Sequence, residues 1–359
     1  MSELESTVGR PSVPSPRTAS EVFLSVRDLR IHFDTDDGVV RSVDGISFDV
    51  RRGRTLGIVG ESGSGKSVTS LGIMGLHRTK RARISGEIWL DDDELITAGE
   101  DFVRRQRGRK MAMIFQDPLS ALHPYYTVGA QIAEAYRVHH PVSRAVAKAR
   151  TTDMLDRVGI PEPRKRYSGY PHEFSGGMRQ RVMIAMALVN NPELLIADEP
   201  TTALDVTVQA QILDLIRDLQ KEFGSAVIVI THDLGVVAEM ADDLLVMYAG
   251  RCVERGTAEQ IFDAPQHPYT WGLLGSMPRI DRDQTERLVP VQGAPPSLIN
   301  VPDGCPFHPR CPYADVPAEN ATRTVRPELR EVGSEHYTAC HLTQQERTRI
   351  WTEEVEPKL

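Results

Sequence analysis

The sequence predicts an α/β protein whose core is a largely parallel sheet connected by helices. Apolar runs of strand length alternate with longer segments whose apolar residues recur at helical spacing. A glycine-rich loop, Gly60–Ser67, follows one apolar run and opens a helical segment. Polar residues directly follow several other apolar runs. Continuous apolar runs are typical of parallel strands buried on both faces, and parallel strands need helical crossovers.

The composition is that of a soluble globular protein. The 359 residues are 40% hydrophobic and 26% charged, and this length suits one large domain plus an extension. The net charge of −8 argues against a nucleic-acid partner. No apolar run reaches the roughly 18 residues of a membrane span, and no charged-then-apolar signal peptide opens the chain. We therefore expect a cytoplasmic protein that reaches a membrane only through partners.

The amino-acid composition changes along the chain and divides it into four predicted parts. Residues 1–20 are rich in Ser, Thr and Pro and predict a disordered tail. Residues 21–256 form the predicted main domain, which includes a helical subdomain over about residues 117–185. Proline becomes frequent in residues 257–342, which also carry three of the four cysteines, and we expect a separate carboxy-terminal extension there. Residues 343–359 are expected to be a charged tail.

The main domain combines two kinds of strand. Short β-rich runs before the glycine-rich loop predict an antiparallel sheet: Val22–Val26, Val39–Val43 and Ile46–Val50. Later apolar runs predict buried parallel strands: Met111–Phe115, Leu194–Glu199 and Ala226–Ile230. A hairpin is predicted for Leu244–Tyr248 and Arg251–Glu254. Helical spacing is clearest in Val128–Val138, Ala145–Val158 and Val206–Phe223. The charged stretch Arg78–Lys110 receives no element.

The glycine-rich loop has the sequence of a phosphate-binding loop. Glycines let the backbone N–H groups turn inward around phosphate oxygens, and the helix N-terminus adds a favourable potential. Lys66 would supply charge to the β- and γ-phosphates, and the Ser67 hydroxyl would bind Mg²⁺. A flexible surface loop is the alternative, which the strand–helix context disfavours. We expect nucleotide contacts from Gly60, Glu61, Ser62, Gly63, Ser64, Gly65, Lys66 and Ser67.

Polar residues at the ends of the apolar strands are predicted to converge on this nucleotide, because the carboxyl ends of parallel strands share one edge. Asp198 would hold Mg²⁺, together with Ser67 and Gln116. Glu199 would act as general base for the attacking water, Gln116 would orient that water, and His232 would contact the γ-phosphate and keep base and water aligned. Each residue taken singly also has a structural explanation, such as a helix cap, but their joint placement favours a site.

Ser175-Gly176-Gly177 is a second candidate anion site. Ser175 is a suitable N-cap, and the two glycines allow close backbone approach at a helix start. A plain helix cap is the alternative. A functional role requires a second subunit, whose phosphate loop would hold the γ-phosphate that this helix tip covers. Phe33 also has two possible roles: it is either an aromatic residue of the core or a turn, or a stacking surface for adenine.

The order of these motifs resembles the ATP-binding cassette family of transporter ATPases. The matching segments are the phosphate loop Gly60–Ser67, the Q-loop at Gln116, the signature Ser175–Gln180, the aspartate–glutamate strand Leu194–Glu199, the D-loop Thr202–Asp205 and the switch histidine His232. The resemblance covers about Val22–Gly256. It implies a P-loop NTPase (RecA-like) core with an antiparallel β subdomain and an inserted helical subdomain.

In that family two nucleotide-binding domains enclose two ATP molecules, each between one phosphate loop and the opposite signature. The resemblance thus implies ATP and Mg²⁺ as ligands, ATP hydrolysis as the reaction, and contacts across the interface from Ser175, Gly176, Gly177, Met178 and Asp205. Phe33 stands where the family places its adenine-stacking aromatic. Phe174 and Met178 replace the commoner leucine and glutamine, which leaves the Ser-Gly-Gly core intact.

A narrower resemblance is to the di- and oligopeptide importer branch, and within it to the D-type ATPase subunit. It rests on Phe174–Arg181, Glu199–Thr207, His267–Thr270 and Gly304–Pro312. The implied partners are a second, similar ATPase subunit, two membrane permeases and an external solute-binding protein, at the cytoplasmic face of a bacterial or archaeal membrane. The helical segment after Gln116 would dock the permease. Nickel or an oligosaccharide are alternative cargoes.

The sequence disfavours two other classes of function. A soluble cassette ATPase of DNA repair or translation usually has a long coiled-coil insertion or two cassettes in one chain, and this sequence shows neither. A regulatory module that only senses nucleotide is disfavoured by the intact Glu199 and His232.

Three cysteines of the extension are candidate metal ligands: Cys305, Cys311 and Cys340. In the importer branch the extension carries four cysteines that resemble a 4Fe–4S ligand set, but here the third position falls near Pro317-Ala318, which cannot coordinate. His336, His341 or a non-protein group could complete the set. Zinc in a Cys₃His site and free thiols are the alternatives. Cys252 is expected to be a buried structural thiol.

Overall fold

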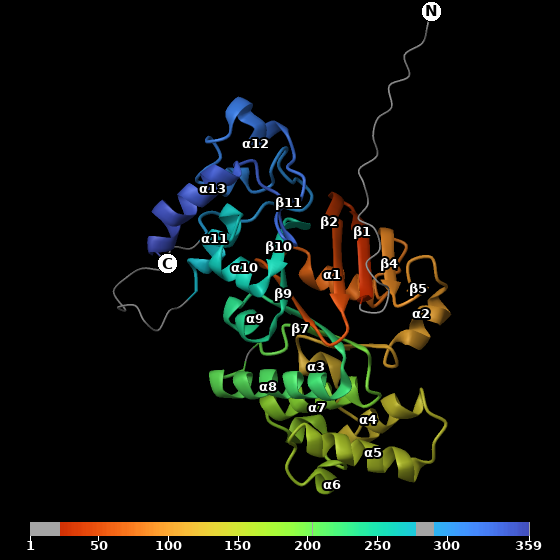
Figure 1. Cartoon of the computed structure of the whole chain (residues 1–359). Helices are drawn as coiled ribbons and strands as arrows, with labels where there is room; N and C mark the ends of the chain where they lie inside the picture. The colour runs from red at the N-terminus through yellow and green to blue at the C-terminus, as the bar shows by residue number, and fades with distance from the viewer. Residues whose placement is uncertain (1–21, 203, 278–290, 359) are drawn as a thin grey trace, which may run out of the picture.

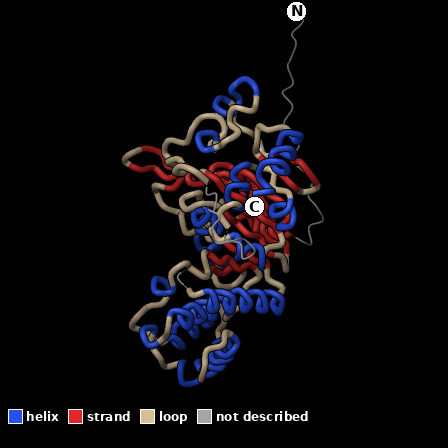
Figure 2. Tube along the Cα trace, turned by 90° about the vertical axis from the view of Figure 1, so that its left-hand side faces the viewer, coloured by secondary structure: helices blue, strands red, loops and turns tan. Residues whose placement is uncertain are grey.

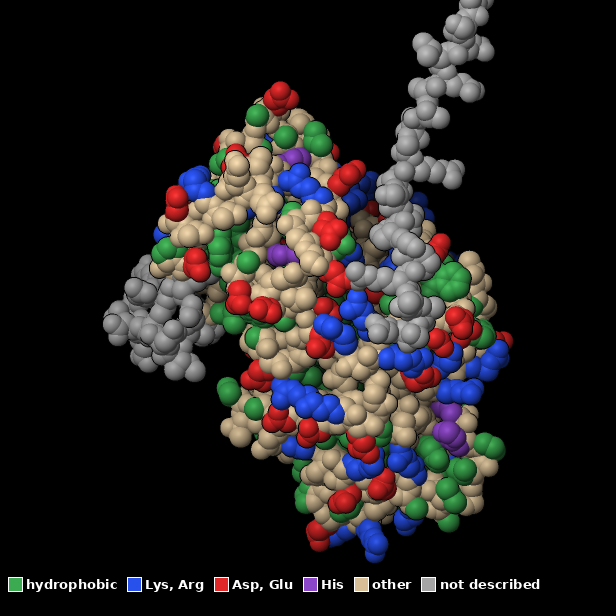
Figure 3. All heavy atoms as spheres, in the orientation of Figure 1, with side chains coloured by type: hydrophobic (Ala, Val, Ile, Leu, Met, Phe, Trp, Pro, Cys, Tyr) green, Lys and Arg blue, Asp and Glu red, His purple; other side chains and the backbone are tan. Residues whose placement is uncertain are grey.

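The computed structural model of this chain describes residues 22–202, 204–277 and 291–358. The tail expected over residues 1–20 lies outside these ranges. Two sheets occupy the centre of the molecule, with helices at one end and the carboxy-terminal residues at the other (Figures 1 and 2). Acidic and basic side chains are interspersed over the face that Figure 3 shows. Among the described residues, no helix is both long and apolar enough to cross a bilayer.

The larger sheet contains the predicted parallel core. Its eight strands lie in the order β11 (Arg330–Gly333), β12 (His336–Thr338), β10 (Arg251–Thr257), β9 (Asp243–Tyr248), β3 (Thr55–Val59), β8 (Ala226–Thr231), β7 (Leu194–Asp198) and β6 (Met111–Ile114). The pairs of neighbours from β9 to β6 are parallel, and those from β11 to β9 are antiparallel. Strands β3, β6, β7 and β8 are buried along their length, as continuous apolar runs predict.

The smaller sheet is antiparallel, in the order β2 (Gly38–Arg51), β1 (Val22–Thr35), β4 (Ala82–Leu90) and β5 (Asp93–Glu94). The two runs expected as separate strands at 39–43 and 46–50 form the single strand β2, because the break at Gly45 is absorbed as an irregularity in its pairing with β1. The stretch Arg78–Lys110 contains β4, β5 and α2 (Glu100–Gln106). β4 escaped prediction because few of its side chains are buried.

Helices between the strands gather below the sheets in Figure 1. They are α3 (Pro118–Ala121), α4 (Val128–Arg137), α5 (Arg144–Arg157), α6 (Pro163–Arg166), α7 (Gly176–Leu188) and α8 (Val206–Phe223). Ile132, Leu155 and Ile184, from α4, α5 and α7, belong to one buried apolar cluster together with Ala197 of β7. This packing fixes α7, and therefore Ser175 at its start, relative to the sheet.

The carboxy-terminal residues expected as an extension pack against the core and continue its large sheet. Strands β12 and β11 extend the large sheet beyond β10. Helices α9 (Leu234–Met240), α10 (Ala258–Asp263), α11 (Pro268–Leu274), α12 (Ala321–Thr324) and α13 (Gln344–Ile350) complete this half. Residues 344–350, expected as part of a charged tail, form α13, whose Arg347 and Ile350 are buried.

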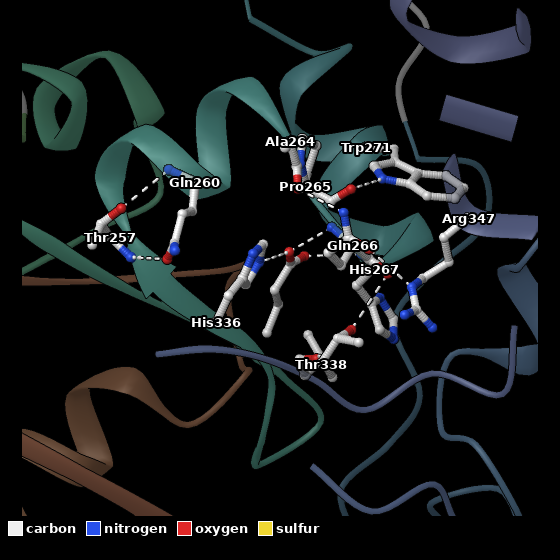
Figure 4. A network of polar contacts seen from close by, with 12 residues as sticks. Thr257, Gln260, Ala264, Pro265, Gln266, His267, Trp271, His336, Thr338 and Arg347 are labelled. Carbon is white, nitrogen blue, oxygen red and sulfur yellow. Dashed lines mark hydrogen bonds and ion pairs between the residues drawn. The ribbon is translucent and has the colours of Figure 1, made fainter. Parts of the chain in front are cut away.

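A buried polar network fastens these residues to the sheet (Figure 4). The fully buried Glu254 carboxylate of β10 accepts hydrogen bonds from the backbone N–H groups of Gln266 (2.5 Å) and His267 (3.0 Å), and pairs with His336 Nε2 of β12 at 2.8 Å. Arg347 Nε of α13 donates to Gln266 Oε1 at 3.0 Å. Removing one partner from such a network leaves a buried polar group unpaired, which makes the network cooperative.

Candidate nucleotide-binding site

The phosphate loop lies at the centre of the large sheet, at the end of β3, and leads into α1 (Lys66–Ile73). Its glycines are required by geometry. Gly60 and Gly65 have φ values of +150° and +104°. A Cβ atom at Gly60 would lie 2.2 Å from the carbonyl oxygen of Met247, and one at Gly65 would lie 2.2 Å from that of Ser42. Any side chain at either position would therefore force the loop away from the two neighbouring strands.

Lys66 is folded back over the loop. Its Nζ donates to the carbonyl oxygens of Gly60 (2.7 Å) and Glu61 (3.0 Å), and the residue is buried. Burial lowers the pKa of Lys66, while the charges of Glu199 and Asp198 oppose that shift. The ammonium is thus held by the loop backbone and attracted by the charges of the two strand-end carboxylates.

Ser67 and Asp198 form a pair of oxygen donors. Ser67 Oγ donates to Asp198 Oδ1 at 3.1 Å, from the first turn of α1 to the end of β7. Burial raises the pKa of Asp198, and the hydrogen bond from Ser67 opposes this rise. Adjacent hydroxyl and carboxylate oxygens are the ligands that Mg²⁺ prefers, so these residues fit such an ion beside the phosphate loop.

Glu199 contacts several of the polar residues that follow the strands. Its Oε2 accepts hydrogen bonds from Gln116 Nε2 and Thr202 Oγ1, both at 2.8 Å, and its Oε1 lies 3.2 Å from His232 Nδ1. Burial favours a higher pKa for Glu199, but the hydrogen bonds from Thr202 and His232 outweigh it and hold the pKa below its ordinary value. Glu199 is therefore ionised at neutral pH, as a proton acceptor must be. It also has a φ of +47°, an uncommon backbone conformation for a residue other than glycine.

The other predicted site residues lie on elements outside this group. Ser175 caps α7, where its Oγ accepts from Met178 N at 3.3 Å, and Gly176 is exposed at the same helix start. Asp205 caps α8 by accepting from Val208 N at 3.0 Å. Phe33 of β1 meets the ring of His77 edge-on, with centroids 5.2 Å apart. Residue 203 of the expected D-loop lies outside the described residues.

The contacts of three residues at the site were not predicted. Thr202 binds Glu199, and Tyr269 and Arg310 contact Glu61 from the carboxy-terminal half. Thr202 is three residues from Glu199, so its contact could have been anticipated as a local turn. Tyr269 and Arg310 are more than 200 residues from the loop in sequence, and no local pattern points from them to it.

The candidate metal ligands are only partly brought together. Cys305, Cys311 and Cys340 line one cavity of about 20 Å³, together with His341 and mainly apolar surface. That volume is close to the size of a single water molecule, so a four-iron cluster does not fit this arrangement. Burial raises the pKa of Cys311 to about 12 and that of Cys340 to about 11. Within the described part of the chain, no group of three or more His, Cys, Asp and Glu residues is arranged to hold a metal ion.

His336, expected as a possible fourth ligand, is instead paired with Glu254. Cys252 is buried in β10, as expected for a structural thiol, and burial raises its pKa to about 12.

Comparisons with known proteins agree with this geometry. Residues 43–202 match the ABC transporter family, and residues 253–316 match the oligopeptide/dipeptide transporter C-terminal region. The oligopeptide transport ATP-binding protein OppD of Escherichia coli is 50% identical over 86% of this chain and 91% of its own length. The dipeptide transport ATP-binding protein DppD of Bacillus subtilis is 53% identical over 81% of this chain and 87% of its own.

Solved structures show the same fold. A dimeric ATP-binding cassette, MJ0796, in a post-hydrolysis state bound to ADP and Pi, has a TM-score of 0.59 and 25% identity. It covers 66% of this chain, and the match spans 98% of that structure. CbiO1 of Clostridium perfringens, part of the ABC transporter complex cbiONQ, has a TM-score of 0.58 and 28% identity over 68% of this chain and 92% of its own.

The chain therefore belongs to the ABC transporter family of ATP-binding proteins, in its oligopeptide and dipeptide branch. Membership in this family implies ATP and Mg²⁺ as the ligands of the phosphate loop.

Proposed function

We propose that this chain hydrolyses ATP to power the import of di- or oligopeptides through a membrane transporter. The observation that carries the proposal is the hydrogen-bonded group of Gln116, Glu199 and His232 beside Ser67 and Asp198. The relatives named as peptide transport ATP-binding proteins, at about half identity over most of the chain, support peptides as the cargo. We assign the ATPase domain to residues 21–256, with its helical subdomain at about 117–185, and the extension to residues 257–342.

In this mechanism the strand-end residues act on one water molecule. Glu199, ionised at neutral pH, accepts its proton, and His232 and Gln116 hold the Glu199 carboxylate in place. Lys66 and the loop N–H groups stabilise the charge on the phosphates. Ser67 and Asp198 would hold Mg²⁺, which would supply positive charge near the transferred phosphoryl group. Phe33 stacks on the adenine.

We infer that a second, similar ATPase subunit completes the site. Ser175, Gly176, Gly177, Met178 and Asp205 would face the nucleotide held by that partner. Support comes from the exposed helix start at Ser175. Figure 1 shows its helix, α7, among the lower helices, while α1 lies beside the small sheet. The matching cassette MJ0796 is itself dimeric.

Two membrane permeases and an external solute-binding protein are the other partners that we propose, at the cytoplasmic face of a bacterial or archaeal membrane. Leu119, Tyr125 and Tyr126 offer an apolar docking surface for a permease, because all three are exposed, Leu119 in α3 and the two tyrosines in the segment that joins α3 to α4. The rings of both tyrosines pack against His123. Tyr125→Ala should weaken association with the permeases without changing nucleotide binding.

A metal in the extension is a separate part of the proposal. Its support is the convergence of the three thiols and His341 on one cavity. An iron–sulfur cluster would require the cavity to open, whereas one zinc ion would require less rearrangement. Anaerobic purification of the full chain followed by iron and zinc analysis tests both. Absence of both metals would leave the cysteines as free thiols.

The decisive test of the function uses the assembled transporter. The full chain is purified with its partners from host membranes and reconstituted in vesicles, and ATP hydrolysis is measured with the solute-binding protein and defined cargoes. Di- or oligopeptides should stimulate hydrolysis. If only nickel or an oligosaccharide stimulates hydrolysis, that solute is the cargo instead. Co-purification of the chain with proteins of DNA repair or translation, in place of permeases, would contradict a role in import.

A further inference from the structure

Arg310 connects the carboxy-terminal half to the phosphate loop. It lies in the short 3₁₀ turn His308–Arg310, and its side chain is 5% exposed. Its Nη1 donates to Glu61 Oε2 at 2.5 Å and its Nη2 to Glu61 Oε1 at 2.9 Å, a two-pronged ion pair with the second residue of the loop. Such fork-to-fork pairs fix orientation as well as charge.

Every N–H group of the Arg310 guanidinium is hydrogen-bonded in this position. Its remaining N–H groups reach the carbonyl oxygens of Gln292 (2.8 Å, from Nε) and Val291 (3.3 Å, from Nη2), and the Tyr248 hydroxyl (3.3 Å, from Nη1). All five donors of an arginine are thus used. The hydrogen bonds to Glu61 raise the pKa of Arg310 above its ordinary value. An arginine held on all sides cannot swing away from Glu61 without breaking several bonds together.

Tyr269 of α11 holds the same loop residue from another side. Its hydroxyl accepts a hydrogen bond from the backbone N–H of Glu61 at 2.8 Å. The ring is fully buried and packs against Tyr248 and Phe307, with centroids 4.7 Å and 5.4 Å away. Because Lys66 binds the Glu61 carbonyl oxygen, the carboxylate, N–H and C=O of Glu61 are each tied to a different group.

We propose that Arg310 and Tyr269 are positioning residues for the phosphate loop, through which the carboxy-terminal extension sets the affinity of this chain for ATP. The inference rests on the proposed function, since it concerns the same nucleotide site. A loop already ordered in its binding conformation does not have to lose that freedom when the nucleotide arrives. The extension thereby contributes to ATP binding without touching the nucleotide.

The test measures ATP binding by the full chain, with a fluorescent ATP analogue and competition by ATP. Arg310→Ala and Glu61→Ala are each expected to raise the Kd roughly tenfold, equivalent to about 1.4 kcal/mol. Because both changes break the same pair, the double variant should be no weaker than either single variant. Arg310→Lys should recover part of the affinity, and Tyr269→Phe should raise the Kd by a smaller factor. In the assembled transporter KM for ATP should rise more than kcat falls.

Arg323→Ala is the matched control. Arg323 belongs to the same extension and pairs with Asp315 at 2.7 Å, but both side chains are exposed. It should leave the Kd unchanged. Equal ATP affinity in the parent and in folded Arg310→Ala and Glu61→Ala variants would overturn the inference, as would strictly additive effects in the double variant. If Arg310→Ala does not fold, the Kd values of Glu61→Ala and Glu61→Gln test the inference by themselves. Failure of the parent itself to bind ATP would instead contradict the proposed function.

Discussion

Glu199 and His232 directly follow neighbouring strands of the large sheet, β7 and β8, and their side chains meet at 3.2 Å; the Glu199 carboxylate is also bound by Gln116. The parallel pairing of β7 with β8 creates this contact, because it brings the two strand ends to the same edge. Two residues 33 positions apart in the sequence are thereby brought into contact.

Glu199→Gln tests the role of this carboxylate. The amide cannot accept the proton of the attacking water, so we expect kcat of the assembled ATPase to fall by about 10²–10⁴-fold while ATP binding is retained. Glu193→Gln is a control from the start of the same strand, where Glu193 pairs with Arg52 at the surface. It should leave turnover unchanged. Normal turnover in Glu199→Gln would remove Glu199 from the role of base.

Lys66→Ala should act at an earlier step. The change removes the positive charge that the loop backbone holds in place for the phosphates, so nucleotide binding itself should be lost. Equilibrium binding of a fluorescent ATP analogue measures this directly. Binding that matches the parent chain would contradict the assignment of Lys66 to the phosphates.

Ser175→Ala separates a cap from a contact with the partner's nucleotide. Ser143 makes the same cap at the start of α5, with Oγ accepting from Val146 N at 3.3 Å. Loss of either cap should cost about 0.5–2 kcal/mol of stability. Only Ser175→Ala should also reduce ATP turnover when the chain is paired with its partner ATPase. Equal turnover in the two variants would mean that Ser175 is only a cap.

Glu254→Ala should destabilise the fold strongly. The change removes the acceptor of two backbone N–H groups and leaves His336 unpaired in a buried position, which we expect to cost about 3–5 kcal/mol. Glu254→Gln keeps an acceptor oxygen and should cost less. Chemical denaturation measures both, with Glu259→Ala at an exposed position of α10 as the control. If Glu254→Ala lowers the free energy of unfolding by less than a typical surface substitution does, the network of Figure 4 does not anchor the extension.

His267 should make stability sensitive to mild acid. Burial lowers its pKa to about 3 in the folded chain, whereas an unfolded histidine titrates near about 6.5. The unfolded state therefore binds more protons between these values, so this contribution to stability is complete above about pH 6.5 and is lost as the pH falls towards 3. His267→Asn keeps an acceptor for the Tyr269 N–H and should flatten the dependence between pH 6.5 and 5. If the free energy of unfolding depends on pH in the same way in the parent and in His267→Asn, this prediction is contradicted.

Much of the nucleotide site follows from the sequence because its residues stand at the ends of apolar strands, and a parallel sheet has one carboxyl edge. Gln116, Asp198, Glu199 and His232 were placed by that rule, and the observed β6, β7 and β8 confirm the three strands on which it relied. The Arg310–Glu61 contact could not be predicted in this way. It depends on how the extension folds back against β9 and β3, which no local pattern encodes.

The sequence was least informative about how the extension packs against the core. Proline frequency and cysteines suggested a separate unit, but β12 pairs with β10 and continues the core sheet. Short strands such as His336–Thr338 carry too few residues for an apolar pattern to be seen. The same limit applies to metal ligands, because the approach of Cys305, Cys311 and Cys340 depends on turns whose geometry the spacing does not fix.

The central claim is that ATP is held by the Gly60–Ser67 loop of this chain and covered by the signature helix of a second subunit. A structure of the nucleotide-loaded transporter carrying Glu199→Gln tests it most directly. We predict ATP between this loop and the partner ATPase, with Ser175 and Gly176 of this chain facing the partner's nucleotide. ATP enclosed by one polypeptide, with residues 175–177 in contact with bulk water, would contradict the account.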